Sequence, residues 1–521
     1  MARFAVPFAP ITPVTSRPWS LGPSATTTPT HEGGTGYTNG DPRTELFNAA
    51  VSGLLADGFY ESASESLTRL RYLTADACAN HPEWVAQFIP WLRNSANLRS
   101  ASVVLAAEYA AAGLPGARNV IAAACQRADE PGEMLAYWHS FHGRNVASRV
   151  KRGLSDACQR LYTERSAARW DGSGKGYRFG DVIEIIHAKP ADAKQSTLYR
   201  FLLDRRRHSV EQAPESLAAT RTLRRFMDAP PELRASWRDG GEPLPSLLSW
   251  ERLAAATPGG LDAAWWSTLI MSGQLGAFAL LRNLNNIDRA MVVDPAVVAE
   301  VSRRLTDQNE IKAARLLPYW FLTAYKAAES DRWNGTLEAG ADIALTNLPA
   351  FSGRTAIMVD CSGSMSDPVG AGKSRQPLSL TSLAAFVAEA LARRCDSAAI
   401  YCYETTILHT ITPKPHVGVL KAASRPEYTP RGGTRTWACL EAVNASEPFD
   451  RFVVLTDEQT GDSDSGQVQR PVVTWNLAGY GQHQAHHGAR NRFLVSGYSD
   501  SALQTLPDVI LHGSTGRWPW E

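Results

Sequence analysis

The sequence lacks long apolar runs. No segment approaches the ~20 uncharged apolar residues that a membrane-spanning helix needs, and the N-terminus has no apolar stretch of signal-peptide length. The seven cysteines are scattered and form no C-x-x-C pair, the spacing typical of zinc and dithiol redox sites. We therefore expect a soluble, cytoplasmic protein with buried, reduced thiols and no membrane partner.

A large net charge is also missing, since 53 Lys and Arg balance 52 Asp and Glu. A balanced total excludes little, because charge of one sign can gather on one face. Between residues 141 and 240, about twenty Lys and Arg stand against about a dozen Asp and Glu. Such a local excess attracts phosphate, so this segment favours nucleic acid as a partner.

The chain is long enough for two or three packing units, and its composition changes twice. Residues 1–40 are rich in Pro, Thr, Ser and Gly and are expected to form an extended arm. Residues 41–350 carry apolar positions three or four apart, and turn signals cut them into helices of roughly 12–18 residues. An irregular HEAT-like array of antiparallel helix pairs would bury these stripes, and a globular bundle is the alternative.

Residues 351–521 follow another pattern. Short apolar runs recur at residues 355–359, 398–402, 451–455, 472–475 and 492–495. Amphipathic helices are expected at about 380–394 and 434–444. Continuous apolar strands that alternate with helices predict a parallel sheet covered on both faces. The predicted fold class is therefore α + α/β, with a doubly wound C-terminal part.

The expected strand ends carry a set of oxygen ligands. In doubly wound sheets, ligands bind beyond the carboxyl ends of the strands, where the loops converge. The set consists of two strand-end carboxylates and three hydroxyls, on Asp360, Asp457, Ser362, Ser364 and Thr434. Hard oxygen donors of this kind suit Mg²⁺ or another divalent cation, and a capped, solvated loop is the alternative.

These residues resemble the metal-ion-dependent adhesion site of von Willebrand factor A-type domains. The D-x-S-x-S segment of that family falls on residues 360–364, its loop threonine on Thr434 and its strand-end aspartate on Asp457. The set offers no nucleophile next to a base, so we expect binding rather than catalysis and assign no catalytic residue. A Mg²⁺-dependent nuclease is the alternative, although two-metal nucleases need more carboxylates than this set provides.

The chain also carries five loose motifs in a fixed order, at residues 32–37 (EGGTGY), 81–94 (from HPEW to LRN), 181–190 (DVIEIIHAKP), 280–284 (LLRNL) and 317–320 (LPYW). Together with the A-type domain they resemble the TROVE-module family, of which the Ro autoantigen and its bacterial orthologs are the type. The resemblance implies a ring of helical repeats whose ends are bridged by the A-type domain. It also implies that single-stranded ends of misfolded noncoding RNA enter a central hole, that Y RNA binds the basic outer surface, and that bacterial relatives work with an exoribonuclease.

The residues between 149 and 206 suit such a ligand. Basic side chains there can neutralise phosphates, and aromatic or imidazole rings can stack on unpaired bases. The candidates for RNA contacts are Arg149, Lys151, Arg152, Arg169, Lys175, Tyr177, Arg178, His187, Lys189, Arg205 and Arg206. For Arg205 and Arg206 the alternative is a solvated helix face, and for His187 it is a helix cap.

The function that we predict is that of a noncoding RNA-binding ribonucleoprotein component. It would be a monomer that binds Y-like RNA and misfolded RNA with single-stranded ends, and it would support RNA quality control or maturation with an exoribonuclease as a candidate partner. The alternative is a metal-dependent protein-protein adaptor that acts through its von Willebrand A-type domain.

Overall fold

The computed structural model describes residues 27–29, 35–37, 42–51, 63–172, 176–209, 212–369, 378–478, 491–496, 506 and 518–521. The chain divides into two compact units. Of the described residues, those within 74–276 and 286–300 belong to the first, here called the helical unit, and those within 27–73, 277–285 and 301–521 form the second, the sheet unit. Since the sheet unit also takes in helices before residue 350, the predicted domain boundaries at residues 40 and 350 stay predictions. Within the described ranges, no helix combines the length and the apolar character needed to cross a membrane.

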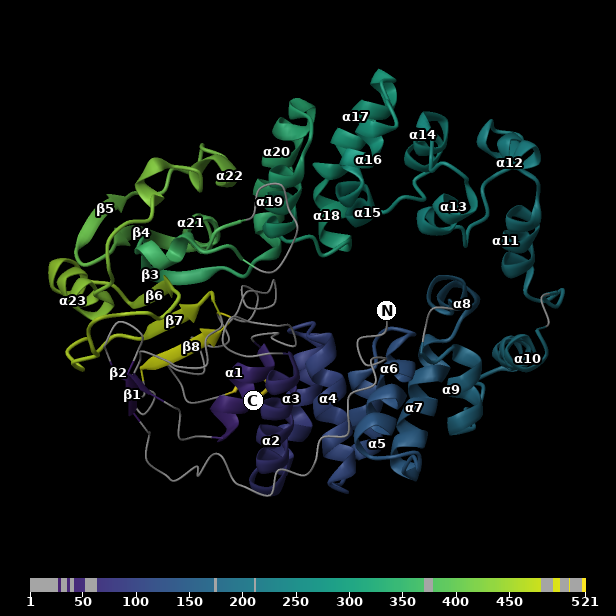
Figure 1. Ribbon diagram of the computed structural model, residues 1–521, viewed down its shortest axis with the longest axis horizontal. Coiled ribbons are helices and arrows are strands. Elements are labelled where there is room, and N and C mark those ends of the chain that lie inside the picture. Colours follow the sequence, from purple (N-terminus) through teal and green to yellow (C-terminus); the bar gives the residue numbers. More distant parts are fainter. Residues whose placement is uncertain are drawn as a thin grey trace. The chain divides into compact units, whose positions relative to one another are not determined.

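The helical unit is built from short helices joined by tight turns. They are α3 (Pro82–Asn94), α4 (Arg99–Ala111), α5 (Ala117–Ala124), α6 (Glu130–Phe141), α7 (Ser148–Leu161), α8 (Glu164–Trp170), α9 (Phe179–Ile186), α10 (Ala193–His208), α11 (Ala218–Asp228), α12 (Pro231–Arg238), α13 (Trp250–Ala256) and α14 (Ala263–Met271). Neighbours in sequence pack on one another, as with α3 on α4, α4 on α5 and α9 on α10 (Figure 1). Such neighbour packing agrees with an array of helix pairs, while the HEAT-like repeat and the ring stay predictions.

Several of these helices are shorter than the predicted length. Helices α8 and α13 have seven residues each, and α5, α9 and α12 have eight. The turns follow one another at shorter intervals along the chain than the spacing of the apolar residues predicts. Gly116 precedes α5 with a φ of 73°, and α12 begins at Pro231, where proline is tolerated because the first turn of a helix does not use its N–H groups.

A buried ionic network ties α3, α4 and α6 together. Glu130 is fully buried, and one of its carboxylate oxygens accepts hydrogen bonds from Arg93 at 2.8 Å and from Arg99 at 3.0 Å. The other oxygen accepts the backbone N–H groups of Gln126 and Arg127. A buried charge with this many donors is compensated only while all of them stay in place.

The sheet unit contains further helices and two short strands. They are β1 (Thr27–Pro29), β2 (Thr35–Tyr37), α1 (Pro42–Val51), α15 (Ala277–Arg282), α18 (Gln308–Ala313), α19 (Pro318–Ala327) and α20 (Asn334–Ala344), while α2 (Ala63–Asn80), α16 (Leu284–Arg289) and α17 (Pro295–Leu305) carry residues of both units. Strands β1 and β2 form an antiparallel pair inside the segment predicted as an extended arm. Gly340 lets α20 approach its neighbours, because a Cβ there would lie 2.6 Å from the carbonyl oxygen of Leu305.

The C-terminal sheet has six strands in the order β5-β4-β3-β6-β7-β8. Their bounds are β3 (Phe351–Asp360), β4 (Cys395–Tyr403), β5 (Ile407–Ile411), β6 (Arg451–Thr456), β7 (Val472–Asn476) and β8 (Arg492–Ser496). The five predicted apolar runs form β3, β4, β6, β7 and β8, which are parallel. Strand β5 was not predicted and runs antiparallel to β4. The prediction of a wholly parallel sheet was therefore wrong at this edge, where a hairpin adds a half-exposed strand.

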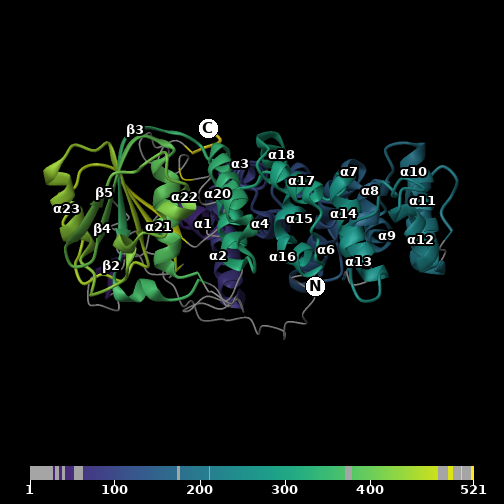
Figure 2. The same cartoon turned by 90° about the horizontal axis from the view of Figure 1, so that it is seen from above.

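Helices cover both faces of this sheet. Helix α21 (Leu380–Ala392) packs against β3, β4 and β6, and α23 (Thr436–Ser446) lies on the other side (Figure 2). Trp437 and Leu440 of α23 share a core with alternate strand residues such as Met358, Tyr401 and Val454. The remaining short elements are α22 (Val419–Ala422) and the 3-10 turns at Asp331–Trp333, Leu345–Asn347, Gly363–Ser366 and Pro426–Tyr428. The predicted doubly wound α/β fold and both predicted helices are thus confirmed.

The seven cysteines all fall within the described ranges and are free thiols. Six of them are buried, and Cys395 is half-buried. The prediction of buried, unpaired thiols therefore fits six of the seven.

Candidate functional site

The predicted metal ligands meet at the carboxyl edge of the sheet. Strand β3 ends at Asp360 and its parallel neighbour β6 ends at Thr456, with Val359 paired to Leu455. Strand β4 adjoins β3 on one side, and β6 adjoins it on the other, so the direction of strand addition reverses at β3. Ligands of doubly wound folds bind at such a reversal. Asp360 and Asp457, the residue after β6, are both fully buried here.

Hydrogen bonds curl the loop that follows β3. The Ser362 N–H donates to Oδ1 of Asp360 over 2.9 Å, and the Thr456 hydroxyl donates to Oδ2 over 2.6 Å. The hydroxyl oxygens of Ser362 and Ser364 lie 3.3 Å apart. The oxygen-bearing side chains of the D-x-S-x-S segment therefore gather beside the end of β6.

The Gly-Gly-Thr loop lies against this segment. Gly363 donates its N–H to the carbonyl oxygen of Gly432 over 3.0 Å, and Thr434, which is buried, accepts the N–H of Gly461 through its carbonyl at 2.9 Å. Gly432 has a φ of 68°, and a Cβ at this position would collide with the carboxylate of Glu404. The positive φ therefore favours glycine at this position, two residues before Thr434.

The electrostatics of this edge favour a cation. Burial, and then the neighbouring carboxylate of Asp457, raise the pKa of Asp360, because two buried negative charges repel each other. Among the residues that the structure describes, no three His, Cys, Asp or Glu side chains form a metal cluster, so hydroxyl groups would have to complete the set. Two carboxylates and three hydroxyls are hard donors of the kind that Mg²⁺ accepts together with water. The residues present therefore fit the predicted cation, which stays a prediction.

Two further residues at this edge were not predicted. The hydroxyl of Thr456 orients Asp360, and it also accepts the N–H of Glu458 at 3.0 Å. Glu458 is buried with a φ of 64°, and its carboxylate accepts a hydrogen bond of 2.7 Å from the amide of Asn476 on β7. Both residues flank Asp457 in the sequence. The left-handed backbone at Glu458 follows Asp457 directly, and no apolar pattern in the sequence reveals it.

Three of the predicted RNA-binding residues form what we call the basic face: Lys151, Arg152 and Lys189. Lys189 donates its N–H to the Ser155 hydroxyl over 3.2 Å, and its carbonyl accepts from the Gln159 amide at 3.0 Å. Lys151 and Arg152 lie one turn before Ser155 on α7. Arg152 and Lys189 are exposed, and Lys151 is half-buried. None of the three takes part in an ion pair within the described ranges.

Two more predicted residues lie near the ends of these helices. Arg149, in the first turn of α7, is exposed and donates from Nε to the carbonyl oxygen of Ala110 on α4 over 2.7 Å. His187 ends α9 as its C-cap, with a φ of 54° and an exposed side chain. The cap that was the alternative for His187 is therefore present, and its ring still faces solvent beside Lys189.

Three other predicted arginines are held in ion pairs. Arg178 and Arg205 both contact the carboxylate of Asp171, Arg178 at 3.5 Å, and Arg206 pairs with Asp181 at 2.6 Å. The side chain of Arg205 is only 16% exposed. Since these charges are already neutralised in part, they have less attraction to offer a phosphate than the basic face.

Of the three remaining predicted residues, Tyr177, Arg169 and Lys175, the first two differ in their environment. Tyr177 is half-buried and hydrogen-bonded to the imidazole of His139, and burial raises the pKa of the Tyr177 hydroxyl. Arg169 is exposed, with its guanidinium 5.0 Å from the ring centre of Trp170. Lys175 lies outside the described residues. The predicted set therefore divides into the exposed basic face and residues that also have contacts within the protein.

Comparison with known proteins relates these sites to a family. Residues 244–345 match the TROVE domain. The chain is similar to the RNA-binding protein RO60 of Caenorhabditis elegans, with 28% identity over 216 residues, which cover 37% of this chain and 32% of that protein. It is also similar to the RNA-binding protein RO60 of Deinococcus radiodurans, with 25% identity over 363 residues, which cover 66% and 63%. The chain thus spans about a third of the length of the Caenorhabditis elegans relative and just under two thirds of the length of the Deinococcus radiodurans relative.

A solved structure extends the likeness to the fold. The crystal structure of the Deinococcus radiodurans Ro (RSR) protein superposes with a TM-score of 0.64 at 19% identity, over 91% of this chain and 100% of that chain. The TROVE match begins after all of the predicted RNA-binding residues, which therefore stay predictions. The predicted resemblance to the TROVE-module family is confirmed: residues 244–345 match the TROVE domain, and the chain has the fold of a Ro protein.

Proposed function

We propose that this protein binds noncoding RNA as a component of a ribonucleoprotein. The observation that carries the proposal is the basic face, where Lys151, Arg152 and Lys189 present charges that no described carboxylate neutralises. Cations of this kind bind phosphates and release the counterions condensed on the nucleic acid. Both curated relatives are named as RNA-binding proteins, which supports the same ligand class for this chain.

The proposal extends to the kind of RNA and to its fate. Y-like RNA would bind a basic outer surface, and single-stranded ends of misfolded RNA would enter a central hole, so that the protein supports RNA quality control or maturation. His187 supports contact with unpaired bases, because its exposed ring lies two residues from Lys189 and can stack on a base. In this proposal the protein acts as a monomer and transfers RNA to an exoribonuclease. No catalytic step is assigned to the chain itself.

The test measures RNA affinity at several salt concentrations. The probe is a fluorescent RNA hairpin with a single-stranded 3′ tail, and the variant replaces Lys151, Arg152 and Lys189 by Ala. Each lost phosphate contact removes about 0.7–0.9 from the slope of log K against log salt, so we expect weaker binding and a slope smaller by about 2–3. The control is Arg207→Ala, since Arg207 is exposed but paired with Glu184 at 2.7 Å. An unchanged affinity and slope in the triple variant would refute the proposed interface.

A metal-dependent protein adaptor is the second candidate function. It is favoured by the buried carboxylates of Asp360 and Asp457, next to a Ser364 that is partly open to solvent. A divalent cation bound there would supply an open coordination position for an acidic group of a partner. If the triple variant keeps its full RNA affinity while Mg²⁺ binding depends on Asp457, the adaptor becomes the better description.

A further inference from the structure

Helix α23 has no N-cap residue of its own. The residue before it, Arg435, carries no side-chain oxygen and makes no capping hydrogen bond. The first N–H groups of a helix have no acceptor within that helix and need one from elsewhere. In α23 these groups belong to Thr436, Trp437 and Ala438, and the first two of these residues are buried. Their acceptors must therefore come from another part of the chain.

The acceptors lie in the loop that follows β6. Thr436 donates its N–H to the hydroxyl of Thr460 over 3.1 Å. The N–H groups of Trp437 and Ala438 donate to the two carboxylate oxygens of Asp462, over 3.3 and 2.8 Å. The Thr460 hydroxyl itself donates to Asp462 over 2.6 Å. We call residues 460–462 the capping segment, because they provide the cap that the sequence before α23 lacks.

The capping segment joins two loops that carry predicted metal ligands. It begins three positions after Asp457, and α23 begins two positions after Thr434. Gly461, at its centre, donates its N–H to the carbonyl oxygen of Thr434 over 2.9 Å. The segment is therefore continuous with one predicted ligand and hydrogen-bonded to the backbone of another.

A buried ion pair holds the chain just beyond the capping segment. Asp464 pairs with Arg492 of β8 at 2.7 Å, and the two side chains are only 4% and 1% exposed. Arg492 also donates to the carbonyl oxygen of Val468 over 2.9 Å, and its guanidinium lies 5.3 Å from the ring centre of Trp437. Loss of either partner would leave a buried charge, so this pair resists opening. The capping segment thus lies between two fixed points, the end of β6 and β8.

We infer that Thr460 and Asp462 are positioning residues of the predicted metal site, which hold Asp457 and Thr434 at the separation that one cation requires. This inference rests on the metal site of the second candidate function. Mg²⁺ demands nearly ideal octahedral geometry with ligands at about 2.0–2.1 Å, so a ligand loop that drifts loses the ion. Groups that orient metal ligands are commonly worth about tenfold to a hundredfold in affinity. Thr460 and Asp462 act through the chain and the backbone of the ligand residues, without binding the ion themselves.

The experiment measures the Kd of MgCl₂ for the full-length protein by calorimetry, and the Tm of each variant without metal. Asp462→Ala removes two capping contacts and should raise the Kd about tenfold to a hundredfold. Thr460→Val removes the hydroxyl at nearly constant volume and should also raise it. Thr460→Ser keeps the hydroxyl and should restore binding close to that of the wild type. This pair decides the matter alone should Asp462→Ala fail to fold.

Two controls separate positioning from charge and from general destabilisation. Asp462→Asn removes the charge but keeps a capping oxygen, and Asn caps helices as well as Asp does, so this variant should bind Mg²⁺ more tightly than Asp462→Ala. Asp307 caps α18 in the same unit by accepting the N–H of Glu310 at 2.8 Å, and α18 carries no predicted ligand. Asp307→Ala should lower the Tm in the way Asp462→Ala does and leave the Kd unchanged.

The outcomes distinguish the inference from the metal site on which it rests. Variants of the capping segment that unfold at a lower temperature but keep the wild-type Kd would show a purely structural cap and overturn the inference. Equal weakening by Asp462→Asn and Asp462→Ala would assign the effect to charge, and equal weakening by Asp307→Ala would assign it to lost stability; either result overturns it as well. A wild type that binds no Mg²⁺ would remove the metal site and the inference together.

Discussion

Replacing Asp457 by Asn should abolish the stabilising effect of Mg²⁺ on the sheet unit. Asp360 and Asp457 are fully buried side by side, and their repulsion destabilises the metal-free fold. The amide removes one of the two charges and keeps an oxygen that can accept the N–H of Gln459, which Asp457 accepts at 3.1 Å. Without Mg²⁺ the variant should therefore unfold at the same temperature as the wild type or at a higher one.

The expected size follows from linkage. Free Mg²⁺ at 100 times its Kd stabilises the folded state by about 2.7 kcal/mol. For a cooperative unit of 150–250 residues, each kcal/mol raises the Tm by about 2–4 °C, so the wild type should gain about 5–11 °C. The variant should gain almost nothing, because a hard cation binds a neutral amide far more weakly than a carboxylate. Thermal unfolding followed by circular dichroism at increasing MgCl₂ measures both effects.

A matched control lies at the other end of the same strand. Asp450 precedes β6 and accepts the N–H of Arg354 at 2.7 Å, far from the carboxyl edge. Asp450→Asn also removes one negative charge, and it should keep the full Mg²⁺ shift. A wild type whose Tm does not respond to Mg²⁺, or an Asp457→Asn variant that keeps the shift, would refute the metal site.

Three further predictions follow from individual contacts. Glu130→Ala should lower the free energy of unfolding of the helical unit by about 3–5 kcal/mol, because it leaves the buried Arg93 without its carboxylate partner, while Arg99 keeps Asp129 and Glu133; a loss below about 1 kcal/mol in urea titrations would contradict this account. Gly340→Ala should cost about 1–3 kcal/mol through overpacking, whereas Gly335→Ala on the same helix, which has nothing within 4 Å of the new Cβ, should be neutral or stabilising. Labelled RNA incubated with the protein and Mg²⁺ should stay intact on a denaturing gel, and cleavage that disappears with Asp360→Ala would make the chain a nuclease.

Much of the sheet unit could be predicted from the sequence because its signals are local. Five strands are uninterrupted apolar runs, and the run at 355–359 lies inside β3. The candidate ligand set could be proposed because Asp360, Ser362 and Ser364 are alternate residues at a strand end. Strand β5 was missed because it is half-exposed and follows a three-residue turn, so its apolar pattern is weak.

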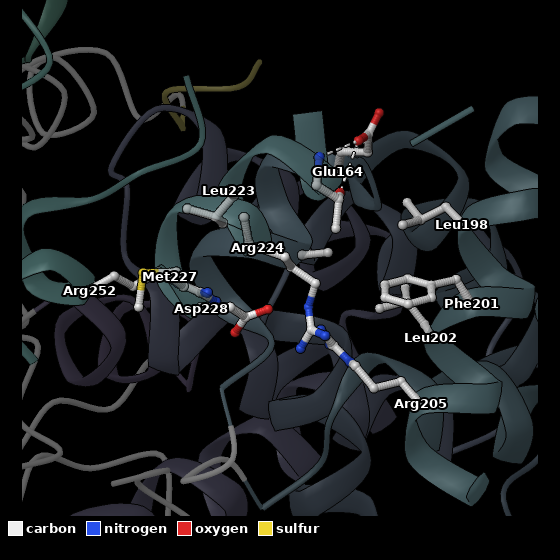
Figure 3. A pocket seen from close by; sticks show the side chains of 13 residues that line it. Glu164, Leu198, Phe201, Leu202, Arg205, Leu223, Arg224, Met227, Asp228 and Arg252 are labelled. Atoms are coloured by element: carbon white, nitrogen blue, oxygen red, sulfur yellow. Dashed lines mark hydrogen bonds between the residues drawn. The ribbon is translucent and has the colours of Figure 1, made fainter. Parts of the chain in front are cut away.

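The helical unit was harder to predict because its important contacts join distant residues. Arg205 was proposed as an RNA contact from its place in a basic run, but it pairs with Asp171, which lies 34 positions earlier. Arg205, Arg224 and Arg252 come from three helices and line one cavity (Figure 3), an arrangement that packing creates and no local pattern predicts. Charge counts thus identified the basic segment and could not separate exposed charges from neutralised ones.

The buried cysteines give both units a built-in reporter. Burial raises the pKa of Cys78, Cys158 and Cys439 to about 12, so at neutral pH almost none of these groups is the thiolate that alkylating reagents attack. Each becomes reactive only when its surroundings open. The first two belong to the helical unit and the third to the sheet unit. Timed alkylation followed by mass spectrometry would therefore report, without engineered labels, which unit opens first and whether RNA or Mg²⁺ slows that opening.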